Sequence, residues 1–269
     1  MIDANLEELI ERADTLLEGG HVADAKRIYR RVCDLEPCHV DARFMLGVIA
    51  SETGEAFLAE QELRAVLATD PTHSDAHYQL AALLSQRGNN VQEALSHAQH
   101  AVTQDDEYPE AWLLLSILQA RTGDLNTACT SSWRAAKLSP DNVQANLNLA
   151  NILRSLGRSG EAVSAFKRVL ELQPNHTGAL TGLAQAELVQ GSLREAAEAA
   201  GAVLASQPGN PEAWFIQGVV HVKRDDLTQA CDCFRKALAH KQDYFASLVN
   251  LGNASLVLAE TKEAENAFT

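Results

Sequence analysis

A fixed spacing of about 34 residues organises this chain. Proline recurs at this interval, or at twice the interval plus one residue, at Pro37, Pro71, Pro140, Pro174 and Pro208. A period in this range is typical of a stacked repeat array, in which each unit contacts only its neighbours. The period is therefore a better guide to architecture than the length of 269 residues, which for a compact fold would suggest one or two domains.

Other residue types keep the same register. Alanine stands twelve residues before each proline, or before the residue in its place, at Ala25, Ala59, Ala94, Ala128, Ala162, Ala196 and Ala230. Glycine stands seventeen residues after it, at Gly54, Gly88, Gly123, Gly157 and Gly191. Between these markers, apolar residues recur at helical spacing. Glycine ends a first helix because it adopts left-handed backbone angles at little cost, and proline ends a second helix because it lacks an N–H.

Each unit is thus predicted to be a pair of antiparallel helices, and the whole chain a single solenoid. We place the units at residues 6–39, 40–73, 74–108, 109–142, 143–176, 177–210, 211–244 and 245–269. The eighth unit breaks off inside its predicted second helix, where Ala264 and Phe268 would be left half covered. Because terminal repeats need a polar outer face, we expect the natural protein to continue beyond Thr269.

The pattern closely resembles the tetratricopeptide repeat family. The matching residues are Trp112, Leu115, Ala128 and Pro140 in one unit, Leu149, Ala150, Gly157, Ala162, Phe166 and Pro174 in the next, and Trp214, Gly218, Ala230 and Phe234 in the seventh. The resemblance implies an all-α, right-handed superhelical solenoid with seven full repeats and a truncated eighth. It also implies a concave face, lined by the first helices, that binds extended peptides or partner helices.

The charge balance disfavours nucleic acid as a partner. The chain carries 22 Lys and Arg against 36 Asp and Glu, a net charge of −14, whereas a nucleic-acid groove needs an excess of basic side chains.

No apolar stretch approaches the length of a membrane span, and the N-terminus lacks the pattern of a signal peptide. Five cysteines are too few and too scattered for a disulfide framework. We therefore expect a cytoplasmic protein, or a periplasmic one if a leader was removed.

No catalytic motif is present, so we expect neither enzymatic activity nor a cofactor in this chain. Cys231-Asp232-Cys233 comes nearest to a metal motif, but cysteines two apart on a helix point in different directions. His73 and His77 are four residues apart, yet His73 falls in a turn. His39, His73 and His176 share one position at the unit end and are interpreted as turn residues. No metal site is predicted.

Two sets of residues are candidates for a binding face on the first helices. Seven residues after the proline position stands a mostly apolar stripe that includes Phe44, Tyr78, Leu113 and Phe215. It is either core between repeats or a row of apolar pockets for a bound segment. The second set consists of two asparagine pairs three residues apart, Asn148 with Asn151 and Asn250 with Asn253. Asparagine is unfavourable inside helices but offers both donor and acceptors to a peptide backbone. Similar asparagines line the superhelix of O-linked N-acetylglucosamine transferase.

We therefore predict a scaffold that binds a protein or peptide partner through the first helices. Acidic residues in the first turn of these helices, Glu7, Asp41, Asp75, Glu110 and Glu212, favour a basic or neutral partner over an acidic tail. One alternative is the partner- or substrate-binding arm of a larger enzyme, such as a glycosyltransferase or sulfotransferase, with its catalytic domain beyond Thr269. Weak self-association through uncapped repeat ends is a third alternative.

Overall fold

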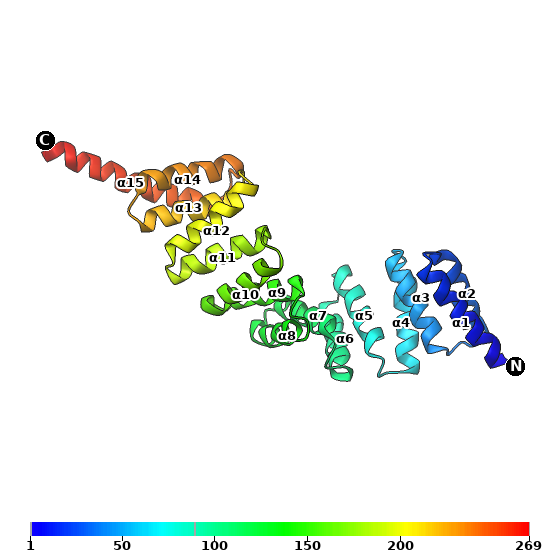
Figure 1. The fold of residues 1–269 in the computed structure, drawn as a ribbon. Coiled ribbons are helices and arrows are strands. Elements are labelled where there is room, and N and C mark those ends of the chain that lie inside the picture. The colour runs from blue at the N-terminus through cyan, green and yellow to red at the C-terminus, as the bar shows by residue number, and fades with distance from the viewer. Residues whose placement is uncertain (1, 89, 269) are drawn as a thin grey trace. The chain divides into compact units, whose positions relative to one another are not determined.

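The structure is a computed structural model that describes the backbone of residues 2–88 and 90–268 and the side chains of residues 6–88 and 90–259. The described residues form fifteen α-helices and no strand (Figure 1). The helices group into two compact units, Met1–Leu138 and Ser139–Thr269, referred to below as unit 1 and unit 2. Helices follow one another in packed pairs, so the predicted all-α architecture of antiparallel helix pairs is confirmed within each unit.

Unit 1 contains α1 (Ile2–Glu18), α2 (Val22–Leu35), α3 (Val40–Glu52), α4 (Ala56–Thr69), α5 (Ser74–Arg87), α6 (Val91–Gln104), α7 (Pro109–Arg121) and α8 (Leu125–Leu138). Unit 2 contains α9 (Val143–Ser155), α10 (Ser159–Leu172), α11 (Thr177–Gln190), α12 (Leu193–Ser206), α13 (Pro211–Lys223), α14 (Leu227–His240) and α15 (Phe245–Phe268). Odd-numbered helices are the first helices of their repeats and even-numbered helices are the second. First helices of successive repeats touch, α3 with α5 and α5 with α7, then α9 with α11, α11 with α13 and α13 with α15. Each unit therefore presents a face built from first helices.

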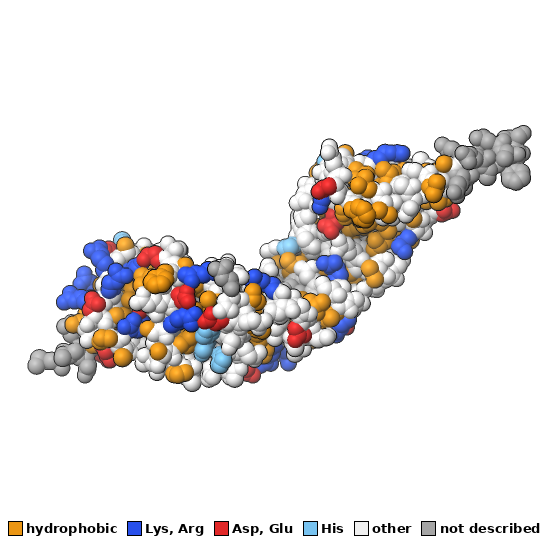
Figure 2. Space-filling view, turned by 180° about the vertical axis from the view of Figure 1, so that it is seen from behind, with side chains coloured by type: hydrophobic (Ala, Val, Ile, Leu, Met, Phe, Trp, Pro, Cys, Tyr) orange, Lys and Arg blue, Asp and Glu red, His pale blue; other side chains and the backbone are white. Residues whose placement is uncertain are grey.

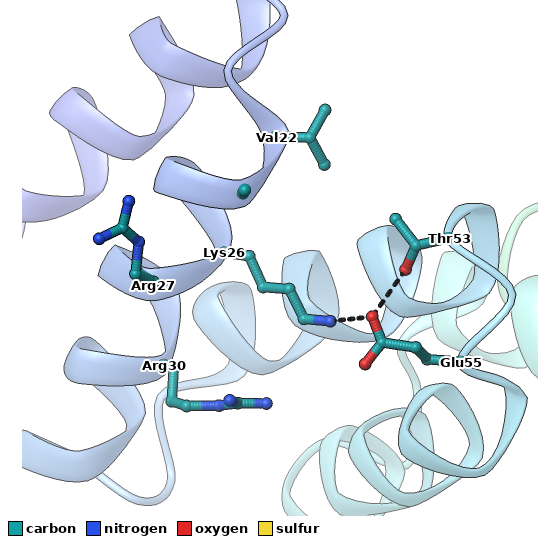
Figure 3. Close-up of a pocket in the computed structure, with 7 residues that line it drawn as sticks. Val22, Lys26, Arg27, Arg30, Thr53 and Glu55 are labelled. Atoms are coloured by element: carbon teal, nitrogen blue, oxygen red, sulfur yellow. Dashed lines mark hydrogen bonds and ion pairs between the residues drawn. The ribbon is translucent and has the colours of Figure 1, made fainter.

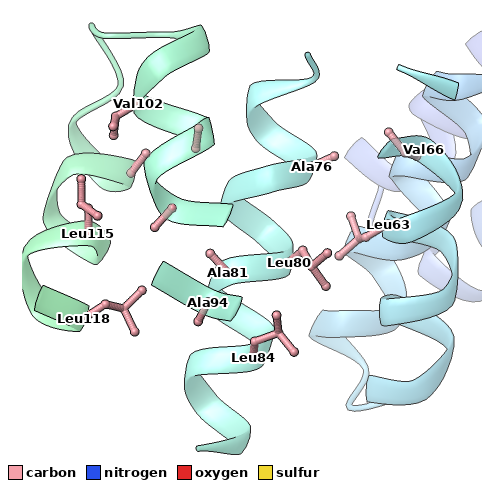
Figure 4. Packing of buried hydrophobic residues seen from close by; sticks show 13 residues of the cluster. Leu63, Val66, Ala76, Leu80, Ala81, Leu84, Ala94, Val102, Leu115 and Leu118 are labelled. Carbon is pink, nitrogen blue, oxygen red and sulfur yellow. The ribbon is translucent and has the colours of Figure 1, made fainter. Parts of the chain in front are cut away.

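Small and branched aliphatic side chains fill the core between repeats. In unit 1 one buried cluster connects α4, α5, α6 and α7 (Figure 4). Leu63 of α4 and Leu80 of α5 are fully buried in it, and Leu115 of α7 is 1 % exposed. The recurrent alanines explain the close approach of the helices, because Ala76 and Ala94 are also completely buried and carry no side chain beyond Cβ.

The predicted left-handed residues end the first helices. Positive φ angles occur at Gly20, Gly54, Gly88, Gly123, Gly157 and Gly191. In the seventh repeat Asp225 stands where glycine would be expected, and its φ of 63° lies in the same left-handed region. Aspartate is one of the few other residues that tolerate this conformation, so the turn survives the replacement.

A hydrogen bond that the sequence did not reveal closes the turn before most first helices. Six residues after the proline position, a side chain donates to the carbonyl oxygen at that position. The donors are Arg43 to Pro37, His77 to Pro71, Trp112 to Asp106, Asn146 to Pro140 and Trp214 to Pro208. Five repeats thus meet one requirement with four kinds of N–H donor, which hides the pattern from a search for identical residues.

Replacing Asn146 with alanine should destabilise the protein by about 1–2 kcal/mol. The buried amide donates to the carbonyl oxygens of Pro140 at 2.9 Å and Asn142 at 2.8 Å, and alanine would leave both without this donor. Chemical denaturation followed by circular dichroism measures the change. Gln144→Ala, at an exposed position of the same helix, is the control, and an equal loss in both variants would contradict the assignment.

The eighth repeat differs from its prediction. α15 runs without a turn through Phe245–Phe268, so a separate second helix does not form there. The position that carries glycine or Asp225 in earlier repeats is occupied by Ala259, which favours continuation of the helix. The side chains of Ala264 and Phe268, expected to be half covered, lie outside the described residues.

Candidate functional site

The apolar stripe of the first helices packs between repeats. Phe44, Tyr78, Leu113 and Phe215 are all half-buried. Three of their rings contact the aromatic or histidine residue that ends the same repeat, directly before the next first helix, in the pairs Phe44–His73 (centroids 4.8 Å apart), Tyr78–Tyr108 (5.0 Å) and Phe215–Tyr244 (5.3 Å). Burial raises the pKa of Tyr78, and the carboxylate of Glu110 raises it further. These contacts support the core interpretation for the buried face of each ring, while the partly exposed face remains a candidate for ligand contact.

The four asparagines lie in different settings. Asn148 and Asn151 are half-buried on α9. On α15, the side-chain amide of Asn250 donates to the carbonyl oxygen of Ala246 at 2.8 Å, and Asn253 is exposed. The two pairs therefore do not form equivalent sites, and α11 and α13 lie between them in the chain.

Asn151 lines a polar cleft of about 300 Å³ in unit 2, which we call the amide cleft. Three first helices and the turn before α13 supply its lining, which is Asn151 and Arg154 from α9, Thr177, Gly178, Thr181, Gly182 and Gln185 from α11, and Asn210 and Glu212 from the start of α13. Carboxamides, hydroxyls, a guanidinium and a carboxylate thus face one space. Asn148, Asn250 and Asn253 do not line it.

Two features make the amide cleft suited to a polar ligand. The Nε atom of Arg154 is buried and has no hydrogen-bond partner among the described residues. A buried donor without a partner is costly, so a change of side-chain conformation that brings this N–H to an acceptor on a ligand gains binding energy. At the other side of the cleft, Gln185 donates through Nε2 to Glu212 at 2.6 Å, which orients both groups.

Gln185 and Arg154 were absent from the predicted set of site residues. Gln185 occupies the same register position as Asn151, eleven residues after the proline, so a search for amides at that position rather than for asparagine pairs would have found it. Arg154 lines the cleft because α9 packs against α11, which the sequence pattern alone does not show.

Histidines at the repeat ends cap helices. Nδ1 of His39, His73 and His176 accepts from the backbone N–H of Ala42, Ala76 and Ala179, at 3.3, 3.3 and 3.1 Å. Asn142 and Asn210 do the same with their side-chain oxygens. The interpretation of these histidines as turn residues is therefore confirmed, with the cap as the physical reason. Within the described part of the chain, no group of three or more His, Cys, Asp and Glu side chains is arranged to hold a metal ion.

A separate cluster of histidine rings lies between α5 and α6. Nδ1 of buried His77 is 2.8 Å from Nδ1 of His97, and the ring of His100 stacks on His77 with centroids 5.0 Å apart. His77 donates through Nε2 to the carbonyl oxygen of Pro71 at 3.0 Å, so its Nδ1 accepts and His97 donates. Burial lowers the pKa of His77, and burial together with His77 lowers the pKa of His97 to about 4. The other charged or titratable groups that act on the cluster are His73, Asp70, Glu93 and Arg64.

Family comparisons agree with the geometry. One tetratricopeptide repeat model matches residues 10–74 and 181–244, and a second tetratricopeptide repeat model matches residues 143–176. The chain belongs to the tetratricopeptide repeat family. The repeats matched by these models include α9 and α11, so the amide cleft lies on first helices of this tetratricopeptide repeat protein.

Several solved structures share the fold at low sequence identity. YrrB, described as a TPR protein with an unusual peptide-binding site, is 21 % identical with a TM-score of 0.64, and the match covers 71 % of this chain and 97 % of YrrB. PilF of Pseudomonas aeruginosa is 20 % identical with a TM-score of 0.65, covering 78 % and 96 % of the two chains. The C-terminal part of a TPR repeat-containing protein from Cytophaga hutchinsonii is 16 % identical with a TM-score of 0.67, covering 90 % and 99 %. No curated protein sequence matches this chain.

One further property concerns membranes. Among the helices that the structure describes, none is both long enough and apolar enough to cross a membrane.

Proposed function

We propose that this tetratricopeptide repeat protein is a non-catalytic interaction scaffold that binds an extended segment of a partner protein in the amide cleft. The observation that carries the proposal is the convergence of two amides in the same register, Asn151 and Gln185, beside the unpartnered Nε of Arg154. Amides can donate to and accept from a peptide backbone without regard to its sequence, so they would hold the main chain of the partner.

The charged residues of the amide cleft would also orient the bound segment. Arg154 would donate to a carbonyl or side-chain carboxylate of the bound segment, and Glu212 would accept from a backbone N–H or a basic side chain. A partner segment with no large net charge fits both groups. In unit 2, Phe215, Asn148, Asn250 and Asn253 remain candidates for contacts with a longer segment, and in unit 1 Phe44, Tyr78 and Leu113 remain candidates for a contact of their own.

Simultaneous replacement of Asn151 and Gln185 with alanine tests the proposal. Peptides are first selected from a displayed library on the unaltered chain, and their affinity is then measured by isothermal titration calorimetry. We expect binding to weaken about tenfold or more, since two backbone hydrogen bonds contribute roughly 1–3 kcal/mol together. Helix content measured by circular dichroism should stay unchanged.

The matched control removes two amides elsewhere. Gln92 and Gln99 of α6 line a different cleft, in unit 1, and their replacement with alanine should leave the affinity of the same peptides unaltered. Peptides that bind both double variants as tightly as the unaltered chain would show that the amide cleft is not the binding site.

A further inference from the structure

Basic side chains gather on α2, the second helix of the first repeat. Lys26, Arg27, Arg30 and Arg31 lie within two turns of this helix, and Arg12 of α1 lies beside it. Figure 2 shows Lys and Arg side chains concentrated at the end of unit 1 that carries α1 and α2. In a chain with a net charge of −14, this is a local reversal of the overall charge.

Only part of this charge is neutralised by neighbouring carboxylates. Lys26 pairs with Glu55, and Arg27 pairs with Asp24. Arg12, Arg30 and Arg31 form no hydrogen bond or ion pair with any other described side chain and are exposed. Three guanidinium groups therefore remain available to an external anion.

Two clefts flank α2 and bring these groups together with apolar surface. The first, of about 460 Å³, contains Val22, Lys26 and Arg30 and is bounded by Glu55 at the start of α4. In Figure 3, Lys26 and Arg30 extend from α2 toward Glu55, whereas Arg27 extends to the other side of the helix. The second cleft, of about 410 Å³, is lined by Arg12, Arg27 and Arg31, by Asp24, which pairs with Arg27, and by the aliphatic side chains of Leu9, Leu16 and Ile28. Arg27 borders both clefts, which makes the surface continuous.

Comparison with the same position in later repeats shows that the fold does not require this charge. In the third repeat the equivalent cleft is lined by Leu95, Ser96 and Gln99, where the first repeat has Lys26, Arg27 and Arg30. In the second repeat the equivalent helix carries Glu60 and Arg64, which pair with each other, and Arg64 also pairs with Glu93. The same backbone setting is thus neutral in one repeat and internally paired in the next, so the unpaired excess on α2 needs another explanation.

We infer that the surface of α2 is a second docking site, separate from the amide cleft, for an acidic polypeptide segment that also carries aliphatic side chains. Carboxylates of the segment would pair with Arg12, Arg30 and Arg31, and its aliphatic groups would cover Leu9, Leu16 and Ile28. A free phosphate ion would use only the charges and leave the apolar floor of the cleft exposed. The phosphodiester backbone of a nucleic acid would likewise pair with the charges and leave these aliphatic side chains uncovered.

A double variant removes the unpaired charge without breaking an ion pair. Arg30→Gln with Arg31→Gln deletes one guanidinium from each cleft, and glutamine is the residue that the third repeat uses at the position of Arg30. The matched control is Arg235→Gln with Lys236→Gln, which deletes two positive charges from the equivalent positions of α14. The probe is a short fluorescein-labelled peptide in which pairs of glutamate alternate with pairs of leucine, and its binding to the full chain is followed by fluorescence anisotropy.

We expect the variant at α2 to bind this peptide about tenfold more weakly, and the control variant at α14 to bind like the unaltered chain. Affinity should also fall when ionic strength rises from about 0.1 M to 1 M, because the screening length shortens from about 10 Å to 3 Å. Any of three results would overturn the inference: no binding to the unaltered chain, equal binding to both double variants, or displacement of the peptide by inorganic phosphate or by phosphatidylserine vesicles.

Discussion

Replacing Gly182 with alanine is expected to destabilise the protein by about 2 kcal/mol. A Cβ at this position of α11 would lie 2.3 Å from Cζ and 2.5 Å from Cε1 of Phe166, far inside van der Waals contact. Phe166 comes from α10 and is fully buried, so its ring has no free space into which it can turn. Overpacking of this kind costs about 1–3 kcal/mol or more, while the higher helix propensity of alanine returns at most about 1 kcal/mol.

The same substitution at Gly201 is expected to have the opposite sign. Gly201 lies inside α12, and an added Cβ would meet only the Nε2 atom of Gln217, at 3.8 Å, which is ordinary contact. Gly201→Ala should therefore stabilise the protein by about 0.5–1 kcal/mol through helix propensity alone. Urea denaturation of both variants measures the two effects. Combining Gly182→Ala with Phe166→Leu should recover part of the loss, and a stability loss at Gly182 no larger than at Gly201 would rule out the ring contact as its cause.

Acidification is expected to weaken unit 1 through the His77–His97 contact. The pKa of His97 in the folded chain, about 4, lies below its ordinary value of 6.5, so the unfolded chain takes up this proton first as the pH falls. Stability is therefore complete above about pH 6.5 and is lost as the pH falls from there toward 4. Between about pH 7 and pH 5 this group alone should remove about 2 kcal/mol, and the lowered pKa of His77 adds to the loss in the same direction.

The contribution of His97 is isolated by comparing variants across pH. His97→Gln keeps an N–H donor for Nδ1 of His77 but cannot titrate, so its free energy of unfolding should change about 2 kcal/mol less between about pH 7 and pH 5 than that of the unaltered chain. Carboxylates titrate in both proteins, and their effect cancels in the comparison. His240→Gln, at an exposed position of α14, serves as the control. An unchanged pH dependence in His97→Gln would show that the contact does not control acid stability.

The helix pairs could be predicted from the sequence because the same physical constraint returns in every repeat. Glycine at Gly157 or Gly191 meets the need for a positive φ, and a small side chain at Ala162 meets the need for close helix packing. Where the chain uses a different residue for the same need, prediction was weaker. The donors to the proline-position carbonyl include Trp112 and Asn146, which share an N–H group but no other property. In the last repeat the turn signal is missing, and α15 continues as one helix.

The candidate sites were harder to predict than the fold. Asn151 was identified because asparagine is unusual inside a helix, but Arg154 and Glu212 come together only when α9, α11 and α13 pack. The basic surface of α2 was hidden by the acidic total, since net charge averages over all repeats. Local charge becomes informative only after equivalent positions are compared between repeats, as with Arg30 and Gln99.

The hydrogen bond that closes the turn in five repeats has a consequence for how the chain can change in length. Donor and acceptor are six residues apart, as in Trp214 and Pro208, so the bond lies entirely within one turn and the helix it opens. Duplication of one full period would add one such hydrogen bond, and deletion would remove one. The hydrogen bonds of the remaining repeats would stay intact. Single repeats can therefore be added or lost without disturbing the turns of the others. The surface charge of one repeat can also change while the other repeats keep theirs.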